Sequence, residues 1–137
     1  MSKTRIVDVS SLDEEVYWGL VSGAFDFERF DVVRAGKGAS EDDICELVRG
    51  ASVIMTDPVH FQPVTRRIIE AADRLGLIQC YTIGFDEVDL VAARERGIPV
   101  ANAAGTLSKP IGEYVITVAL YLLKSLDFAR SEMSKGN

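Results

Sequence analysis

The sequence predicts an α/β fold around a parallel sheet, and three observations support this interpretation. Five short apolar runs of strand length alternate with segments whose apolar residues recur at helical spacing. The connections between these segments are short. One stretch, residues 77–102, contains a strand, a glycine turn, a helix, a glycine stop and a further strand in that order. Such alternation implies parallel strands, right-handed crossovers and helices on both faces of the sheet.

The first half of the chain is expected to hold three strands and two helices. The first helix should start at Ser10 or Ser11, because a serine side chain can cap a helix N-terminus. Ser40 should cap the second helix, with Asp43 at the partner position of a capping box. The predicted strands are residues 5–9, 30–35 and 53–56, and the first helix extends to about residue 22.

The second half continues the same alternation. Pro63 fits the first turn of a third helix, which Gly76 ends. After a strand at 77–81, Asp86 and Asp89 bracket the start of a fourth helix, and Gly97 is its expected stop. A fifth strand follows at 98–100, and one long helix is predicted over 110–133. A solvated helix face is expected at Arg94, Glu95 and Arg96.

This order of elements predicts a flavodoxin-like architecture, with strand order 2-1-3-4-5 and a long C-terminal helix. Ligands of such sheets bind at the carboxyl ends of the strands. The last helix is apolar nearly all round, which is typical of a helix buried on more than one side. We therefore expect a second surface to cover it, and a homodimer formed through residues 110–133 would provide one.

Composition limits the classes of function. A chain of 137 residues is of single-domain length, and its net charge of −6 disfavours nucleic acid or an anionic membrane as a partner. Its longest uncharged apolar stretch is too short to cross a bilayer. The two cysteines show no spacing typical of a disulfide or metal framework. A cytoplasmic location is expected.

The stretch that follows the fourth strand carries a resemblance to a known family. The matching positions are Thr82-Ile83-Gly84-Phe85-Asp86, Val88-Asp89-Leu90, Ala92-Ala93, Gly97-Ile98, Val100 and Asn102. This pattern closely resembles the D-isomer-specific 2-hydroxyacid dehydrogenases, which include glyoxylate/hydroxypyruvate reductases and phosphoglycerate dehydrogenases. The resemblance implies the same flavodoxin-like fold, since the family's substrate domain has it. It also implies a small 2-hydroxy or 2-keto acid as substrate.

The parts of the family enzymes that carry out the chemistry are not found in this sequence. Those enzymes bind NAD(P) through a Gly-x-Gly-x-x-Gly turn in a second domain, which also carries the catalytic Arg, Glu and His. This sequence contains no such turn, and the run Gly36-Lys37-Gly38 has the wrong glycine spacing. We therefore expect a substrate-binding domain at 1–108 and a connector helix at 109–137 that leads to a missing NAD-binding domain. No catalytic, cofactor-binding or metal-binding residue is expected, and the chain should be inactive alone.

The resemblance also implies where substrate binds. In the family, the backbone N–H groups at the positions of Ile83 and Gly84 receive the substrate carboxylate, and Thr82 fits the small polar residue beside them. Thr56 and Asp57 end the third strand at another position that faces substrate, although Asp57 would repel a carboxylate. The alternative for each position is structural, as a tight turn or a helix-capping residue.

A second group of residues matches the region between the two domains of the family enzymes. The resemblance places Asn102, Gly105 and Thr106 near the domain cleft, and Glu113 matches a family position in the following helix. Turn geometry and helix capping are the alternative roles. The single histidine, His60, is expected to pack in a loop rather than to bind a metal.

Two alternatives to an enzyme fragment stay open. One is a non-catalytic homodimeric interaction module that uses the apolar last helix. The other is a phosphorylation-switched receiver domain, which shares the flavodoxin-like fold. Asp8, Asp57, Thr82 and Lys109 lie near the positions that a receiver would need, but Ser10 and Ser11 stand where it would carry an acidic pair.

Overall fold

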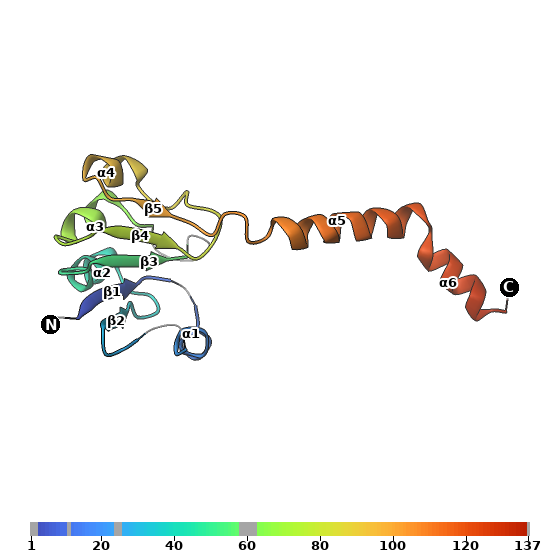
Figure 1. Cartoon of the computed structure of the whole chain (residues 1–137), viewed down its shortest axis with the longest axis horizontal. Helices are drawn as coiled ribbons and strands as arrows, with labels where there is room; N and C mark the ends of the chain where they lie inside the picture. The colour runs from blue at the N-terminus through green and yellow to red at the C-terminus, as the bar shows by residue number, and fades with distance from the viewer. Residues whose placement is uncertain (1–2, 11, 24–25, 58–62, 137) are drawn as a thin grey trace. The chain divides into compact units, whose positions relative to one another are not determined.

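The computed structural model describes residues 3–10, 12–23, 26–57 and 63–136. Contacts along the backbone divide the chain into two compact units, residues 1–103 and 104–137. Each unit is described by itself below. Figure 1 shows the order of the elements in both.

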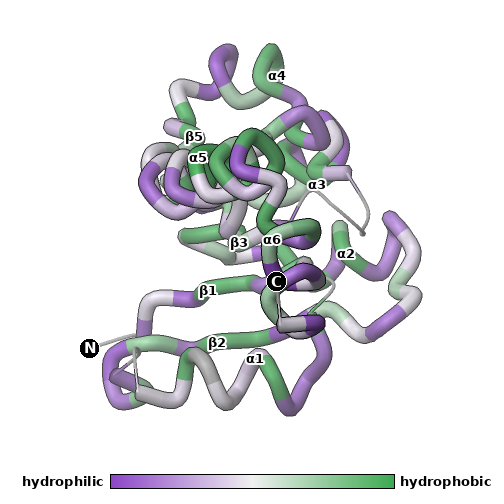
Figure 2. Tube along the Cα trace, turned by 90° about the vertical axis from the view of Figure 1, so that its right-hand side faces the viewer, coloured by the Kyte–Doolittle hydropathy of each residue, from purple (hydrophilic) through white to green (hydrophobic). Residues whose placement is uncertain are grey.

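The first unit contains a five-stranded parallel sheet in the order β2-β1-β3-β4-β5 (Figure 1). This confirms the predicted topology. Hydrophobic segments run along β1 and β2 in Figure 2, as expected for strands buried by packing. The strands are β1 (Thr4–Asp8), β2 (Phe30–Arg34), β3 (Val53–Thr56), β4 (Leu77–Cys80) and β5 (Val100–Ala101).

Helices cover both faces of this sheet. Helix α3 lies between α2 and α4 (Figure 1), and their apolar side chains form one cluster with Val7, Ile54 and Ile78 of the strands. Because side chains alternate along a strand, Asp8 faces the opposite side. There the ring of Tyr17 from α1 lies against Arg34 of β2. The helices are α1 (Glu14–Val21), α2 (Glu41–Leu47), α3 (Arg66–Ala71) and α4 (Leu90–Glu95).

The predicted start of α2 is confirmed. Ser40 and Asp43 form a full capping box, in which Ser40 N donates to Asp43 Oδ2 at 2.9 Å and Asp43 N donates to Ser40 Oγ at 3.2 Å. Asp89 caps α4 and accepts a hydrogen bond from Ala92 N at 2.8 Å. The sequence predicted Asp86 as the cap and Asp89 within the first turn, which is wrong, because Asp86 lies before the helix and Asp89 is the cap itself. Gly97 has a φ of 66°, the left-handed conformation expected just after a helix.

The predicted starts of α1 and α3 are wrong. Helix α1 begins after Asp13, whose side chain accepts from Glu15 N, and not after Ser10, whose N–H donates to Asp8. Ser11, the other predicted start, lies outside the described residues. Helix α3 begins after Thr65 rather than at Pro63. Val64, which stands between Pro63 and Thr65, pairs with Val88 in a parallel β-bridge, and this pairing prevents α3 from starting earlier.

The second unit contains α5 (Ser108–Leu123) and α6 (Leu126–Ser134), so the single helix predicted over 110–133 is wrong. Ser125 interrupts it with a φ of 47°, a conformation that costs energy for any residue except glycine. The hydroxyl of Tyr121 donates to Asp127 across this break. Asp127 also suits the first turn of a new helix.

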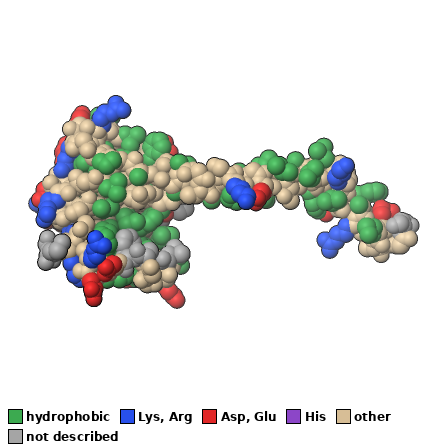
Figure 3. All heavy atoms as spheres, viewed as in Figure 1, with side chains coloured by type: hydrophobic (Ala, Val, Ile, Leu, Met, Phe, Trp, Pro, Cys, Tyr) green, Lys and Arg blue, Asp and Glu red, His purple; other side chains and the backbone are tan. Residues whose placement is uncertain are grey.

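The apolar side chains of the second unit remain on its surface. Neither α5 nor α6 buries a residue, and hydrophobic side chains are visible along both in Figure 3. Val115 is 58% exposed and Leu122 is 69% exposed. No helix among the described residues is both long and apolar enough to cross a membrane.

Candidate functional site

The bend that follows β4 presents two neighbouring backbone N–H groups. Tyr81 N donates to Thr56 O at 2.9 Å, so the sheet pairing continues to the edge of this bend. Beyond it, neither Ile83 nor Gly84 donates a backbone hydrogen bond within the described part of the chain. Ile83 is 41% exposed. Successive free N–H groups at a strand end form a concavity that attracts anions.

The segment after β5 holds this bend in place. Asn102 Nδ2 donates to Ile83 O at 2.6 Å, and Ala103 N donates to Thr82 O at 2.9 Å. The hydroxyl of Thr82 donates to Gly84 O at 3.2 Å. The structure therefore brings Thr82, Ile83, Gly84 and Asn102 together. Because the C=O and N–H groups of a trans peptide point in opposite directions, the N–H groups of Ile83 and Gly84 point away from the donors at residues 102 and 103.

The end of β3, at Thr56 and Asp57, lies at the same edge of the sheet as the bend but is more buried. Thr56 is only 2% exposed, and its backbone pairs with Cys80. Asp57 follows it and is half-buried. The next residues, including Pro58 and His60, lie outside the described residues.

The remaining residues of the predicted interdomain group fall in the second unit. Gly105 has a φ of 87°, so its backbone conformation requires glycine. Thr106 follows it before α5 begins. Within α5, Glu113 lies 3.9 Å from Lys109 in an i,i+4 ion pair. These observations fit turn and helix roles within this unit.

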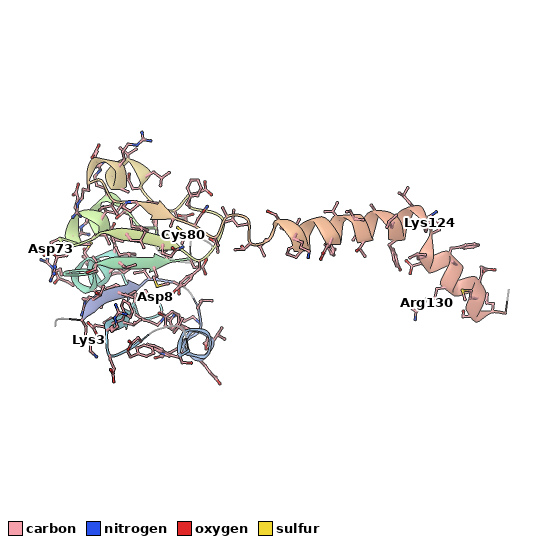
Figure 4. All side chains as sticks on the ribbon, viewed as in Figure 1. Lys3, Asp8, Asp73, Cys80, Lys124 and Arg130 are labelled. Carbon is pink, nitrogen blue, oxygen red and sulfur yellow. The ribbon has the colours of Figure 1, made fainter. Side chains whose placement is uncertain are left out.

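A buried polar cluster that sequence reasoning missed lies at the end of β1. Asp8, labelled in Figure 4, is fully buried. Its carboxylate accepts from Ser10 N at 2.7 Å and from the hydroxyl of Tyr81, and Arg34 Nε lies 3.9 Å away. The Arg34 guanidinium is also 4.1 Å from the ring centre of Tyr17. The one feature of the sequence that could have revealed this cluster is Asp8 itself, because an acidic residue in an apolar strand indicates a buried polar partner.

The tyrosines of this cluster stay protonated. Burial, followed by the hydrogen bond to Asp8, raises the pKa of Tyr81 far above its usual range. Burial also raises the pKa of Tyr17. Tyr81 is therefore a permanent hydrogen-bond donor to Asp8.

A small cavity adjoins the bend. Its volume is about 230 Å³, and its lining is three apolar side chains and one amide, from Phe85, Leu90, Val100 and Asn102. Asn102 thus connects the cavity to the carbonyl of Ile83. The cavity offers an apolar surface beside the two free N–H groups.

The residues present do not fit a dinucleotide or a metal ion. The turn from β1 to α1, residues 9–13, contains no glycine that would let a pyrophosphate approach the backbone. The glycine loop before α2 leads into Glu41, Asp42 and Asp43, whose charges repel phosphate at that helix N-terminus. Among the described residues, no group of three His, Cys, Asp or Glu side chains could hold a metal ion.

Comparison with known proteins identifies the family. The model of the D-isomer specific 2-hydroxyacid dehydrogenase catalytic domain matches residues 8–134. The chain therefore belongs to the D-isomer specific 2-hydroxyacid dehydrogenase family, as the pattern around Gly84 predicted.

Sequence relatives with curated descriptions include D-3-phosphoglycerate dehydrogenases. The Escherichia coli K12 enzyme is 37% identical over 102 residues, which cover 73% of this chain and 24% of that protein. The Dictyostelium discoideum enzyme is 32% identical over 109 residues, which cover 80% of this chain and 26% of that protein. The chain thus spans about a quarter of the length of these relatives.

Solved structures show the same fold. The 2-hydroxyacid dehydrogenase of Ketogulonicigenium vulgare Y25 matches with a TM-score of 0.71 at 24% identity, over 100% of this chain and 42% of that one. The NAD⁺-bound 3-phosphoglycerate dehydrogenase of Entamoeba histolytica matches with a TM-score of 0.67 at 20% identity, over 88% of this chain and 39% of that one.

Proposed function

We propose that this chain is the substrate-binding part of an NAD(P)-dependent D-2-hydroxyacid dehydrogenase. The bend at residues 82–84 would hold the carboxylate of a small 2-hydroxy or 2-keto acid through the N–H groups of Ile83 and Gly84. The observation that carries this proposal is the pair of unused N–H groups on a bend that Asn102 fixes. Family membership supports it.

The proposed roles of the neighbouring residues follow from their charge and burial. Two N–H groups can bind a carboxylate and orient the carbon that carries the hydroxyl or keto group. The cavity beside Phe85 and Leu90 would take an apolar part of the ligand. Asp57 would repel a carboxylate, so its proposed role is to shape the end of β3, and buried Thr56 would support the bend from below.

Hydride transfer in this proposal needs a second domain. Bound NAD(P) supplies the hydride acceptor or donor, and the residues of this chain do not fit that cofactor. The catalytic acid/base would also come from that domain, because the family enzymes carry their catalytic Arg, Glu and His there. The chain alone should therefore bind substrate without turning it over.

The decisive experiment follows the amide signals of Ile83 and Gly84 by NMR during titration with glyoxylate. We expect both signals to shift in a saturable manner, whereas glycolamide, which lacks the carboxylate, should leave them in place. Absence of shifts with glyoxylate would refute the proposed site. In parallel, NADH oxidation with glyoxylate or hydroxypyruvate should be undetectable, and turnover by this chain would refute the need for a second domain.

We also propose that the chain forms a homodimer through residues 110–133. Exposed Ile111, Val115 and Leu122 lie on α5 at spacings of four and seven residues, which gives one apolar stripe. A second copy would bury this stripe symmetrically. Sedimentation at tens of micromolar should show a dimer that Leu122→Glu converts to a monomer, with Lys109→Glu as a charge control outside the stripe. A monomeric wild type would contradict the proposal.

The glyoxylate titration, rather than the dimer experiment, separates the enzyme part from a non-catalytic interaction module, because such a module would dimerise without binding glyoxylate. We do not favour the receiver hypothesis, although a receiver would share this fold, because Asp8 is buried against Tyr81 and Arg34 rather than open to a metal ion. A cytoplasmic location stays part of the proposal, and it agrees with two free, buried cysteines.

A further inference from the structure

We infer that the hydrogen bond from Tyr81 to Asp8 positions the substrate-binding bend, which makes Tyr81 and Asp8 positioning residues. This inference rests on the proposed function of residues 82–84. Tyr81 lies between β4 and that bend, and its N–H still donates to Thr56 O at the end of β3. An interaction that holds Tyr81 in place therefore also holds the start of the bend in place.

The side chain of Tyr81 crosses β3 to reach β1. Asp8 pairs in register with Met55, and Met55 pairs with Gln79, two residues before Tyr81. Because alternate residues of a strand share a face, all four side chains lie on the same side of the sheet. The Tyr81 hydroxyl passes 3.6 Å from Met55 Sδ and donates to Asp8 Oδ2. The bond therefore anchors the end of β4 to a strand two positions away.

Asp8 is itself held in place by other partners. Its other oxygen accepts from Ser10 N at 2.7 Å, and Arg34 lies beside it. A fully buried carboxylate that loses a partner pays a large desolvation cost, so Asp8 cannot turn away from Tyr81 without penalty. Tyr81 in turn remains a phenol and keeps its proton for this bond.

The bend is thus held from two sides. Tyr81 fixes it from β1, and Asn102 and Ala103 fix its carbonyls from the segment after β5. The N–H groups of Ile83 and Gly84 belong to the same two peptide units as the held carbonyls of Thr82 and Ile83. A binding site whose geometry is set before the ligand arrives loses less free energy on binding. Removing one attachment should loosen the bend and weaken carboxylate binding.

The test compares Tyr81→Phe with Tyr121→Phe in the full chain. Both substitutions remove a tyrosine–aspartate hydrogen bond, but the second lies between α5 and α6. For Tyr81→Phe we expect the glyoxylate Kd to rise by about fivefold, as for loss of one buried hydrogen bond. Backbone ¹⁵N order parameters of Ile83 and Gly84 should fall toward about 0.6, the range of flexible loops. Tyr121→Phe should change neither quantity.

Unchanged order parameters and Kd in a folded Tyr81→Phe variant would overturn the inference. If wild type binds no glyoxylate, the proposed function fails, but the order parameters still decide whether Tyr81 positions the bend. If Tyr81→Phe does not fold, Asp8→Asn replaces it, because an asparagine of similar volume has only one acceptor for the two donors. We expect the same loosening at Ile83 and Gly84, and a rigid bend in Asp8→Asn would also overturn the inference.

Discussion

At the scale of single residues, Arg96 shows how a surface residue can join two helices. The sequence predicted a solvated face at residues 94–96, and this is confirmed, since all three side chains, including that of Arg96, are exposed. The Arg96 guanidinium donates to the carbonyl of Ile69 and, at 3.0 Å, to Ala72 O at the end of α3. These carbonyls are among those that a helix C-terminus leaves without a partner.

Replacement of Arg96 should therefore destabilise the fold. We expect Arg96→Met to lower the free energy of unfolding by about 1–2 kcal/mol, because charged hydrogen bonds to these carbonyls are lost. Arg94→Met, in the same helix, should stay within about 0.5 kcal/mol of wild type. Urea denaturation followed by Trp18 fluorescence measures both, and equal effects would contradict the role of Arg96.

At the scale of an element, the capping box of α2 makes stability depend on pH. Hydrogen bonds from the Ser40 side chain and backbone lower the pKa of Asp43 below its usual value. Since the unfolded chain then binds a proton more readily than the folded one, Asp43 stabilises the fold above its unfolded-state pKa. This contribution is lost as the pH falls through the lower folded-state pKa.

Thermal unfolding between about pH 7 and pH 2 tests this prediction. We expect Asp43→Asn to have a lower Tm than wild type at neutral pH and to approach wild type at the acidic end. Asp42→Asn, which changes the adjacent charge outside the capping box, is the control. A constant difference between Asp43→Asn and wild type across the range would count against the linkage.

The junction of α5 and α6 gives a second prediction at this scale. The positive φ of Ser125 is sterically unfavourable for serine, whereas glycine adopts that conformation without steric cost. Ser125→Gly should therefore stabilise the second unit by about 1 kcal/mol, and Ser125→Ala should not. Amide hydrogen exchange of Leu123 to Asp127 is the measurement. Slower exchange of these amides in Ser125→Ala than in Ser125→Gly would contradict the prediction, because it would show that the chain favours a continuous helix through residue 125.

At the scale of the whole molecule, the buried apolar cluster lies entirely in the first unit. Its buried members run from Val7 to Ile98 in sequence. A fragment of residues 1–103 should therefore unfold cooperatively and retain its near-ultraviolet circular dichroism. A fragment of residues 1–97 removes Ile98 and β5, so it should lose both properties. Failure of the longer fragment to fold would show that the first unit depends on α5 and α6.

The sequence allowed most of this sheet to be predicted, because local signals and packing agree there. Apolar strand runs, the cap Ser40 and the helix stop Gly97 are readable within a few residues. The start of α3 was missed because Val64 pairs with Val88, a contact that only the folded chain creates. The break at Ser125 was missed because the apolar pattern continues through it.

The candidate site was predictable only in part. Ile83 and Gly84 were found through a family pattern, and the pairing of Asn102 with Ile83 gives that pattern a physical reason. Asp8 and Tyr81 are 73 positions apart in the chain. Neither spacing nor composition could reveal their contact, because it depends on the order of the strands.

The edges of the sheet limit how this protein can aggregate. β5 has two residues and follows Pro99, and β2 carries Asp31 and Arg34 among its five residues. Short or charged edge strands resist pairing with the sheet of another molecule. Growth into cross-β fibrils is therefore disfavoured at both ends of the sheet, even in concentrated solution.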